Sequence, residues 1–270
     1  MQNPLVESYF RMEKLPHIWC PGCGHGIAMA AIARAIEKKG LDKDKVCIVS
    51  GIGCSSRAPG YMDFNTLHTT HGRALAFATG VKLANPELEV IVIAGDGDLS
   101  AIGGNHLIHA ARRNINIKTI CFNNNIYGMT GGQYSPTTAT GDKGTTAPFG
   151  NIDRPFDITQ LAAGAGATYA AKATVYHVNL LQKYIEAALD HNGFSMVEAV
   201  SVCPTYYGRK NKRGTAVEMM DWLKDSYIDK SIAEKMPEKA QGKFLMGEYV
   251  NKIEPEYTEL YEQVIERLKK

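Results

Sequence analysis

Four of the six cysteines in this sequence are placed where they could bind a metal. The run Cys20–Cys23 (Cys-Pro-Gly-Cys) puts two thiolates on one tight turn, while Cys54 and Cys203 each stand beside glycine or proline in a predicted loop. Such thiolates bind Zn²⁺ or iron–sulfur clusters. The spacing favours one [4Fe–4S] cluster, because zinc usually takes a second close pair of cysteines. A zinc site, a redox dithiol and plain core packing stay open as alternatives.

An acidic turn and a run of asparagines could bind a metal-linked phosphate. Gly95–Asp98 (Gly-Asp-Gly-Asp) follows an apolar run, and Asn123–Asn125 follows the next apolar run along the chain. Carboxylate and amide oxygens suit Mg²⁺, and glycine lets the backbone approach a phosphate closely. The alternative is that both segments are ordinary structural turns, in which asparagine is used for its left-handed backbone.

The remaining two cysteines have a simpler interpretation. Cys47 and Cys121 lie inside short apolar runs. A free cysteine is readily buried as a small hydrophobic residue, and a disulfide framework is not expected in a reducing compartment. We therefore expect both residues in the core.

The elements that must position these groups alternate between strands and helices. Helices are expected over Gly26–Lys39 (closed by Gly40), Gly72–Ala84, Ala101–Arg113, Ile158–Ala163 and Val178–His191, and strands over Val46–Ser50, Glu89–Ala94, Ile117–Phe122 and Phe194–Val200. This alternation predicts an α/β fold whose mainly parallel sheet carries helices on both faces. Because ligands bind at the carboxyl ends of such strands, we expect the loops that start at 51, 95 and 123, together with Cys203, at one sheet edge. Residues 128–151 are expected to form a long loop.

Composition bounds the class of protein. The chain has 270 residues, of which 44% are hydrophobic and 21% charged, and a net charge of +2. These values are ordinary for a globular protein and indicate neither nucleic acid nor a membrane as partner. Residues 1–14 lack the apolar stretch of a signal peptide, so a cytoplasmic location is expected. We expect one α/β domain over residues 1–204 and a mostly helical C-terminal extension over residues 205–270.

Six motifs that occur in one order carry a family resemblance. They are Trp19–His25 (WCPGCGH), Gly51–Ser55 (GIGCS), His71–Arg73 (HGR), Gly95–Asp98 (GDGD), Arg112–Asn114 (RRN) and Tyr127–Gln133 (YGMTGGQ). Together they resemble the beta subunit of 2-oxoacid:ferredoxin oxidoreductases, and the stretches 133–138 and 146–151 look most like the 2-oxoglutarate branch. This resemblance implies the thiamine-diphosphate-binding fold.

The resemblance also implies three sets of binding residues. One [4Fe–4S] cluster would be held by Cys20, Cys23, Cys54 and Cys203. Mg²⁺ would be held by Asp96, by the side chain of Asn124 and by the backbone carbonyl of Ile126. Thiamine diphosphate would contact Ile52, Gly53, Cys54, Ser55, His71, Gly97, Asp98, Gly128 and Met129.

The function implied is oxidative decarboxylation of 2-oxoglutarate to succinyl-CoA and CO₂ with reduction of ferredoxin, or the reverse carboxylation. No catalytic residue is assigned in this chain, since the carboxylate that activates the cofactor is expected from a partner alpha subunit. Gamma and delta subunits are further candidate partners, and the chain alone should be inactive. Gly131 occupies a position where some family members carry lysine, so the substrate carboxylate must be bound elsewhere.

Other readings stay open at this point. The substrate could instead be pyruvate or a branched-chain 2-oxoacid. From other classes, the chain could be a non-oxidative thiamine-dependent decarboxylase or synthase, or a zinc-binding interaction subunit. A basic cluster at Arg209, Lys210, Lys212 and Arg213 could contact coenzyme A phosphates, an acidic ferredoxin or a partner subunit, or could be a solvated loop.

Overall fold

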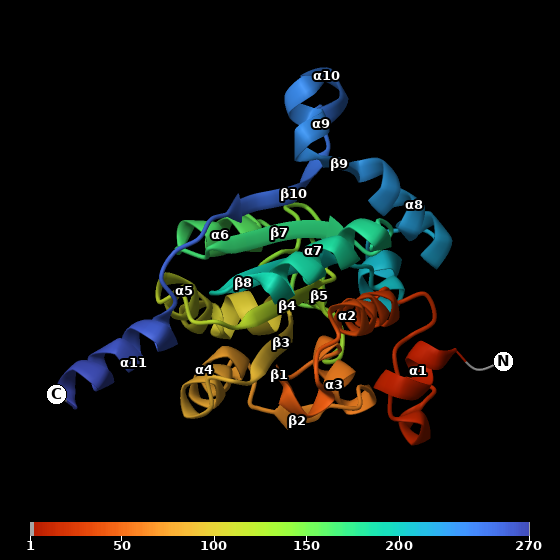
Figure 1. Cartoon of the computed structure of the whole chain (residues 1–270). Coiled ribbons are helices and arrows are strands. Elements are labelled where there is room, and N and C mark those ends of the chain that lie inside the picture. The colour runs from red at the N-terminus through yellow and green to blue at the C-terminus, as the bar shows by residue number, and fades with distance from the viewer. Residues whose placement is uncertain (1–2, 270) are drawn as a thin grey trace.

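A computed structural model describes residues 3–269, and an eight-stranded sheet forms its centre (Figure 1). The strand order is β2-β1-β3-β4-β8-β7-β10-β9, and all these neighbours pair in parallel except β7 and β10. The strands are β1 (Val46–Ser50), β2 (Asn65–His68), β3 (Glu89–Gly95), β4 (Lys118–Asn123), β7 (Tyr169–Thr174), β8 (Ser195–Val200), β9 (Tyr227–Asp229) and β10 (Phe244–Asn251). A separate short hairpin pairs β5 (Ile126–Tyr127) with β6 (Gln133–Tyr134).

Helices cover both faces of the sheet, as predicted. On one face α2 (His25–Lys39) packs beside α7 (Val178–Asp190), and on the other lie α4 (Ala74–Ala84), α5 (Gly104–Arg112) and α6 (Ile158–Gly164). Strand β3 is continuously apolar because it is buried on both faces. Ile91 and Ile93 enter one core, while Val90 and Val92 enter the other. A strand buried on both faces has no polar alternation. The fold class expected from the sequence is confirmed.

Glycine is required at the end of one helix and at the start of another. Gly40 closes α2 with a left-handed backbone (φ 60°), as a C-terminal cap requires. The helix expected from Ala101 instead begins with a π turn over Asp98–Ile102, and α5 follows it. A Cβ on Gly103 would lie 2.3 Å from the carbonyl oxygen of Asp98. The wide turn therefore depends on a glycine at this close approach.

Cys47 and Cys121 lie on β1 and β4 and are both buried in one hydrophobic core. Their predicted role as core residues is confirmed. In the part of the chain that the structure describes, no helix is both long and apolar enough to cross a membrane.

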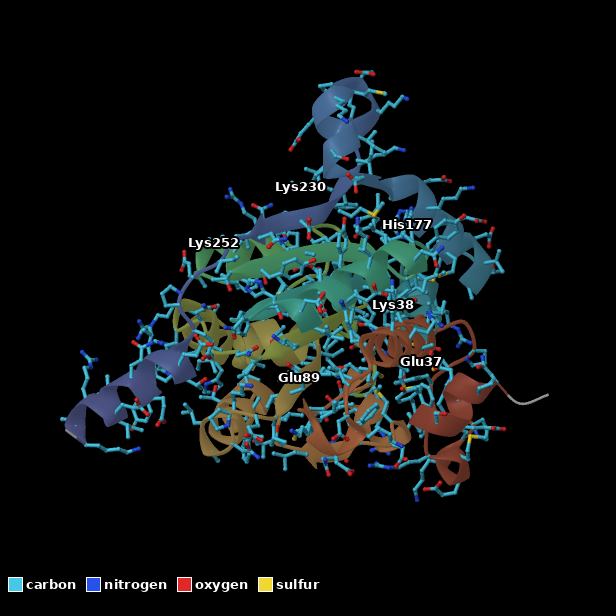
Figure 2. All side chains as sticks on the ribbon, in the orientation of Figure 1. Glu37, Lys38, Glu89, His177, Lys230 and Lys252 are labelled. Atoms are coloured by element: carbon cyan, nitrogen blue, oxygen red, sulfur yellow. The ribbon has the colours of Figure 1, made fainter. Side chains whose placement is uncertain are left out.

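The segment after residue 204 contains strands as well as helices. Its helices are α8 (Ala216–Ser226), α9 (Lys230–Lys235), α10 (Pro237–Ala240) and α11 (Tyr257–Leu268). Strand β10 joins the sheet, where Gly247 pairs with Lys172 of β7. Figure 2 shows Lys230 at the base of the projecting α9–α10 pair and Lys252 just beyond the other end of β10. The boundary at residue 204 stays a prediction, although the extension supplies two strands to the sheet.

Five of the remaining short helices lie before β2, and a π turn follows β8. They are α1 (Pro4–Tyr9) and α3 (Ala58–Tyr61), with 3₁₀ turns at Met12–Lys14, Lys43–Lys45 and Ser55–Arg57, and the π turn covers Pro204–Gly208.

In the basic cluster, Arg213 donates to Asp142 at 3.1 Å and lies 5.5 Å from the Trp222 ring centroid. This arginine is therefore part of the packing between the long loop and α8.

Candidate functional site

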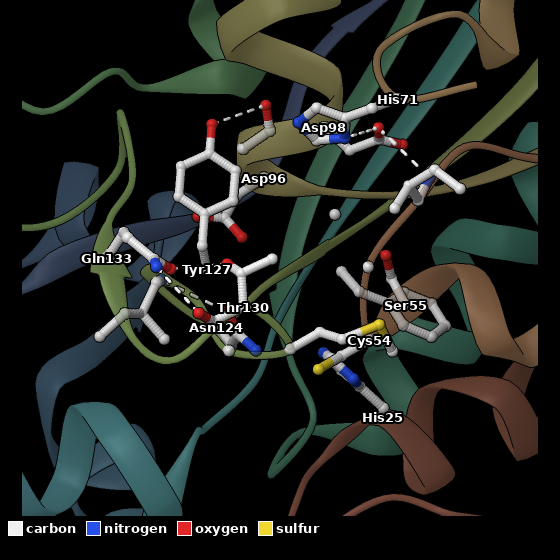
Figure 3. Close-up of a pocket in the computed structure, with 18 residues that line it drawn as sticks. His25, Cys54, Ser55, His71, Asp96, Asp98, Asn124, Tyr127, Thr130 and Gln133 are labelled. Atoms are coloured by element: carbon white, nitrogen blue, oxygen red, sulfur yellow. Dashed lines mark hydrogen bonds and ion pairs between the residues drawn. The ribbon is translucent and has the colours of Figure 1, made fainter. Parts of the chain in front are cut away.

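The carboxyl ends of β1, β3, β4 and β8 bring the predicted loops together at one edge of the sheet. These four strands are consecutive neighbours and run in parallel, so the expectation of a shared edge is confirmed. A cavity of ≈ 460 Å³ opens there (Figure 3). All nine predicted thiamine-diphosphate contacts line it, together with the three predicted Mg²⁺ ligands: Ile52, Gly53, Cys54, Ser55, His71, Asp96, Gly97, Asp98, Asn124, Ile126, Gly128 and Met129.

Asp96 is a buried carboxylate at the base of this cavity. It is 3% exposed, and its Oδ2 accepts hydrogen bonds from the hydroxyls of Ser135 and Thr137, both at 2.6 Å. Burial raises the pKa of Asp96 to about 6, although these hydrogen bonds act in the opposite direction. Asn124, also buried, lines the same cavity. A bound divalent cation would offset the cost of the buried charge, so these oxygen groups fit Mg²⁺.

Sequence reasoning missed the hydroxyls that hold Asp96, because they come from the long loop, at residues 135 and 137. Thr137 also donates to Asn123 Oδ1 at 3.0 Å, and the Asn123 amide donates to Glu198 Oε1 at 2.7 Å. Glu198 is buried on β8 and lies 3.3 Å from the Lys172 ammonium. Burial alone would lower the pKa of Lys172, but Glu198 and Asp157 outweigh it and raise that pKa. The first asparagine of the triple is thus part of a structural network behind the metal site.

Replacing Thr137 by valine should weaken Mg²⁺-dependent cofactor binding by about 10- to 100-fold, the usual cost of losing a group that orients a metal ligand. Valine keeps the shape of threonine but removes the hydroxyl that fixes Asp96 and Asn123. A titration of thiamine diphosphate at fixed Mg²⁺ measures the effect. Thr140→Val is the matched control, because Thr140 lies in the same loop and its hydroxyl donates to the Asp153 carbonyl at 2.8 Å, away from Asp96. Equal affinity in the two variants would contradict the role of Thr137.

Asp98 connects two of the predicted loops with the turn at His71 and Gly72. Its Oδ1 accepts from the Gly72 backbone N–H at 2.6 Å and from that of Ile52 at 3.4 Å, and it lies 2.6 Å from His71 Nδ1. Burial raises the pKa of Asp98, while the Gly72 N–H and His71 lower it. A Cβ on Gly51 would lie 2.1 Å from Asp98 Oδ2. The carboxylate therefore holds His71 and Ile52 at the cavity wall and requires glycine beside it.

The four loop cysteines converge next to the same cavity. A Cβ on Gly128 would lie 3.3 Å from Cys54 Sγ and 3.7 Å from Cys203 Sγ, so these two sulfurs face one spot. Burial raises the pKa of Cys23 to about 12, with smaller contributions from the charges of Cys203, Cys54 and Cys20. The pKa of Cys54 is likewise raised to about 11, first by burial and then by Cys203 and Cys20. Four thiolates in this arrangement need a cationic group between them.

Backbone N–H groups already point at two of these sulfurs. Against the larger effect of burial, the backbone N–H of His25 lowers the pKa of Cys23, and that of Met129 lowers the pKa of Cys54. The run Cys20–Cys23 is closed by a 3.0 Å bond from the Cys23 N–H to the Cys20 carbonyl. Donors of this kind stabilise anionic sulfur.

His25 also lines the cavity, although nothing in the sequence singled it out within its motif. It is 1% exposed, and burial lowers its pKa to about 4. Its ring lies 5.2 Å from that of Phe122 and 5.7 Å from that of Trp19, between centroids. The imidazole is therefore held neutral between two aromatic side chains.

Comparisons with known proteins agree with this geometry. Residues 51–199 match the family described as thiamine pyrophosphate enzyme, C-terminal TPP binding domain. The chain is 51% identical to a 2-oxoglutarate synthase subunit KorB from Methanothermobacter thermautotrophicus over 96% of this chain and 90% of that protein. It is 45% identical to a 2-oxoacid:ferredoxin oxidoreductase subunit beta from Saccharolobus solfataricus over 70% of this chain and 62% of that protein. A solved 2-oxoglutarate:ferredoxin oxidoreductase from Magnetococcus marinus, with 2-oxoglutarate, coenzyme A and succinyl-CoA bound, superposes with a TM-score of 0.87 and 34% identity, covering 100% of this chain and 92% of that one.

Proposed function

This chain belongs to the beta subunits of the 2-oxoacid:ferredoxin oxidoreductases, and we propose that it carries the thiamine-diphosphate and iron–sulfur sites of a 2-oxoglutarate-specific enzyme. The reaction is the coenzyme A-dependent oxidative decarboxylation of 2-oxoglutarate to succinyl-CoA and CO₂ with reduction of ferredoxin, or its reverse. Similarity to KorB subunits over nearly the whole chain supports this reaction and substrate.

Thiamine diphosphate, when bound, supplies the electron sink for loss of CO₂ from a 2-oxoacid. In this chain Asp96, Asn124 and the Ile126 carbonyl would hold Mg²⁺, because all three are buried residues that line the cavity. Gly97 also lines the cavity and would contact the diphosphate, and its lack of a Cβ makes room for Tyr127, since a Cβ there would lie 2.2 Å from a carbon of that ring. His71, which Asp98 holds in place, would contact the cofactor beside this turn.

A [4Fe–4S] cluster, when bound to the four cysteines, supplies one-electron acceptance. Cys54 and Cys203 come from separate loops and do not form a second close pair of the kind that zinc usually takes, which favours a larger cofactor with one thiolate at each iron. The N–H groups of His25 and Met129 would stabilise the negative charge on the cluster sulfurs.

One observation carries the redox assignment. Cys54 lines the thiamine-diphosphate cavity, and its thiol also faces the same spot as that of Cys203. A single loop between β1 and α3 would thus contact both cofactors. The non-oxidative decarboxylase alternative gives no reason for a thiolate group at this place.

A partner subunit completes the site. Among the residues that line the cavity, the two carboxylates are Asp96 and Asp98. The first is held by Ser135 and Thr137, and the second by Gly72 and His71. The alpha subunit would therefore supply the carboxylate that activates the cofactor. Ferredoxin and coenzyme A enter as the electron acceptor and the acyl acceptor of the reaction.

The proposed activity is tested on the native complex, isolated anaerobically. We expect viologen reduction with coenzyme A and 2-oxoglutarate to exceed that with pyruvate or branched-chain 2-oxoacids by at least about tenfold, a difference of about 1.4 kcal/mol in transition-state binding. Preference for another 2-oxoacid would keep the mechanism and overturn the substrate. No reduction by a complex that contains partner, cofactor and cluster would favour the non-oxidative alternative.

A further inference from the structure

His25 is a buried polar residue that has no partner for its ring in the described protein. It opens α2, two residues after Cys23, and is only 1% exposed. Within residues 3–269 neither Nδ1 nor Nε2 has a hydrogen-bond partner. Buried side-chain nitrogens are nearly always hydrogen-bonded. The imidazole therefore requires an acceptor that this chain does not itself provide.

The ring is fixed at one end of the cavity. His25 lines the cavity together with Cys54 and Phe122, and Figure 3 shows its imidazole at the Cys54 end, away from His71 and Asp98. The Trp19 ring packs edge-on against His25 at 5.7 Å, while its indole N–H donates to the Cys54 carbonyl at 2.7 Å. Phe122 packs on the imidazole at 5.2 Å. These contacts tie the orientation of His25 to the loop that carries Cys54.

We propose that His25 is a positioning residue for the iron–sulfur cluster, whose sulfurs on the Cys54 side accept a hydrogen bond from its ring N–H. The inference rests on the proposed function, because it requires the cluster. The imidazole of His25 would add a side-chain donor beside the backbone N–H groups of His25 and Met129, which lower the pKa of Cys23 and Cys54 against the larger effect of burial. A neutral imidazole always carries one N–H, and no change of protonation is involved.

The consequence is a higher reduction potential for the cluster. A hydrogen bond to sulfur stabilises the reduced state, which carries more negative charge. Electron uptake from the neighbouring cofactor then becomes more favourable. His25 would connect the two sites through electrostatics while making no bond to iron.

Three variants of the full complex test this role by redox titration monitored by electron paramagnetic resonance. His25→Phe keeps the ring but removes the donor, and should shift the cluster potential to more negative values at unchanged iron content and unchanged thiamine-diphosphate affinity. His25→Gln retains an N–H and should recover part of the shift. His17→Phe is the matched control, because exposed His17 also packs on Trp19, at 4.9 Å between ring centroids, and does not line the cavity.

A wild-type potential in His25→Phe would overturn the proposal, as would weaker thiamine-diphosphate binding with no change in potential. Should His25→Phe fail to assemble, pulsed resonance on the reduced wild-type complex, with ¹⁵N in the histidine rings, decides the question. A weak nitrogen coupling to the cluster that His25→Gln removes supports the role, and its absence overturns it. A wild-type complex without iron and sulfide would instead refute the proposed function itself.

Discussion

Replacing Cys54 by alanine should abolish electron transfer from 2-oxoglutarate to viologen. The variant lacks one of four cysteines at a site where burial, and then the neighbouring cysteines, raise the pKa of Cys23 and of Cys54. A cluster with three protein ligands would be lost or badly exposed to oxidation. Because Cys54 also lines the cofactor cavity, its loss affects both proposed sites. The assay is viologen reduction by the anaerobic complex, with iron and acid-labile sulfide measured on the same sample.

Two further cysteine variants separate the possible causes. Cys20→Ala removes another proposed cluster ligand that does not line the cavity, so it should lose iron and turnover but keep its affinity for thiamine diphosphate. Cys47→Ala removes a buried thiol in the β1 core and should leave turnover near that of the wild type, at a cost of about 1 kcal/mol in stability. Normal turnover by Cys54→Ala without iron would refute the electron-transfer role.

The elements predicted correctly from sequence are those whose signal is local. Helix α2 has a closing glycine, and β1, β3 and β4 are short β-branched runs bounded by turns. Strand β7 was not predicted, because Tyr169–Thr174 contains three alanines and a lysine. Its extended form comes from pairing with β8 and β10. Tertiary contacts of this kind override weak local propensity.

The sequence was sufficient to bring site residues together wherever the topology of the sheet alone determines where they lie. Parallel strands present their carboxyl ends on one edge, so the groups that follow β1, β3 and β4 had to meet. Ser135 and Thr137 were missed because they lie in a long loop whose path no periodicity determines. His25 was missed as a site residue because its significance lies in two unpaired nitrogens, and sequence does not reveal which polar groups lack partners.

Replacing Asp96 by asparagine should reduce Mg²⁺-dependent binding of thiamine diphosphate by more than about 100-fold, since the cost of losing a direct ligand exceeds that of losing an orienting group. Asparagine is isosteric, but it removes the negative charge that Mg²⁺ requires. Titration calorimetry on the complex measures the affinity, and viologen reduction should fall in parallel. The iron and sulfide content should not change, because the four cysteines are untouched.

The thermal stability of the same variant distinguishes lost binding from lost folding. Burial raises the pKa of Asp96 to about 6, so its ionised form is destabilising until a cation binds. The cofactor-free Asp96→Asn complex should therefore melt no earlier than the wild type, whereas added Mg²⁺ and thiamine diphosphate should raise the melting temperature of the wild type alone. Asp190→Asn is the control, because Asp190 is largely exposed and pairs with Lys39; such surface pairs contribute about 0–1 kcal/mol. A cofactor-dependent rise in the Asp96→Asn complex would show that the cation is held by other groups.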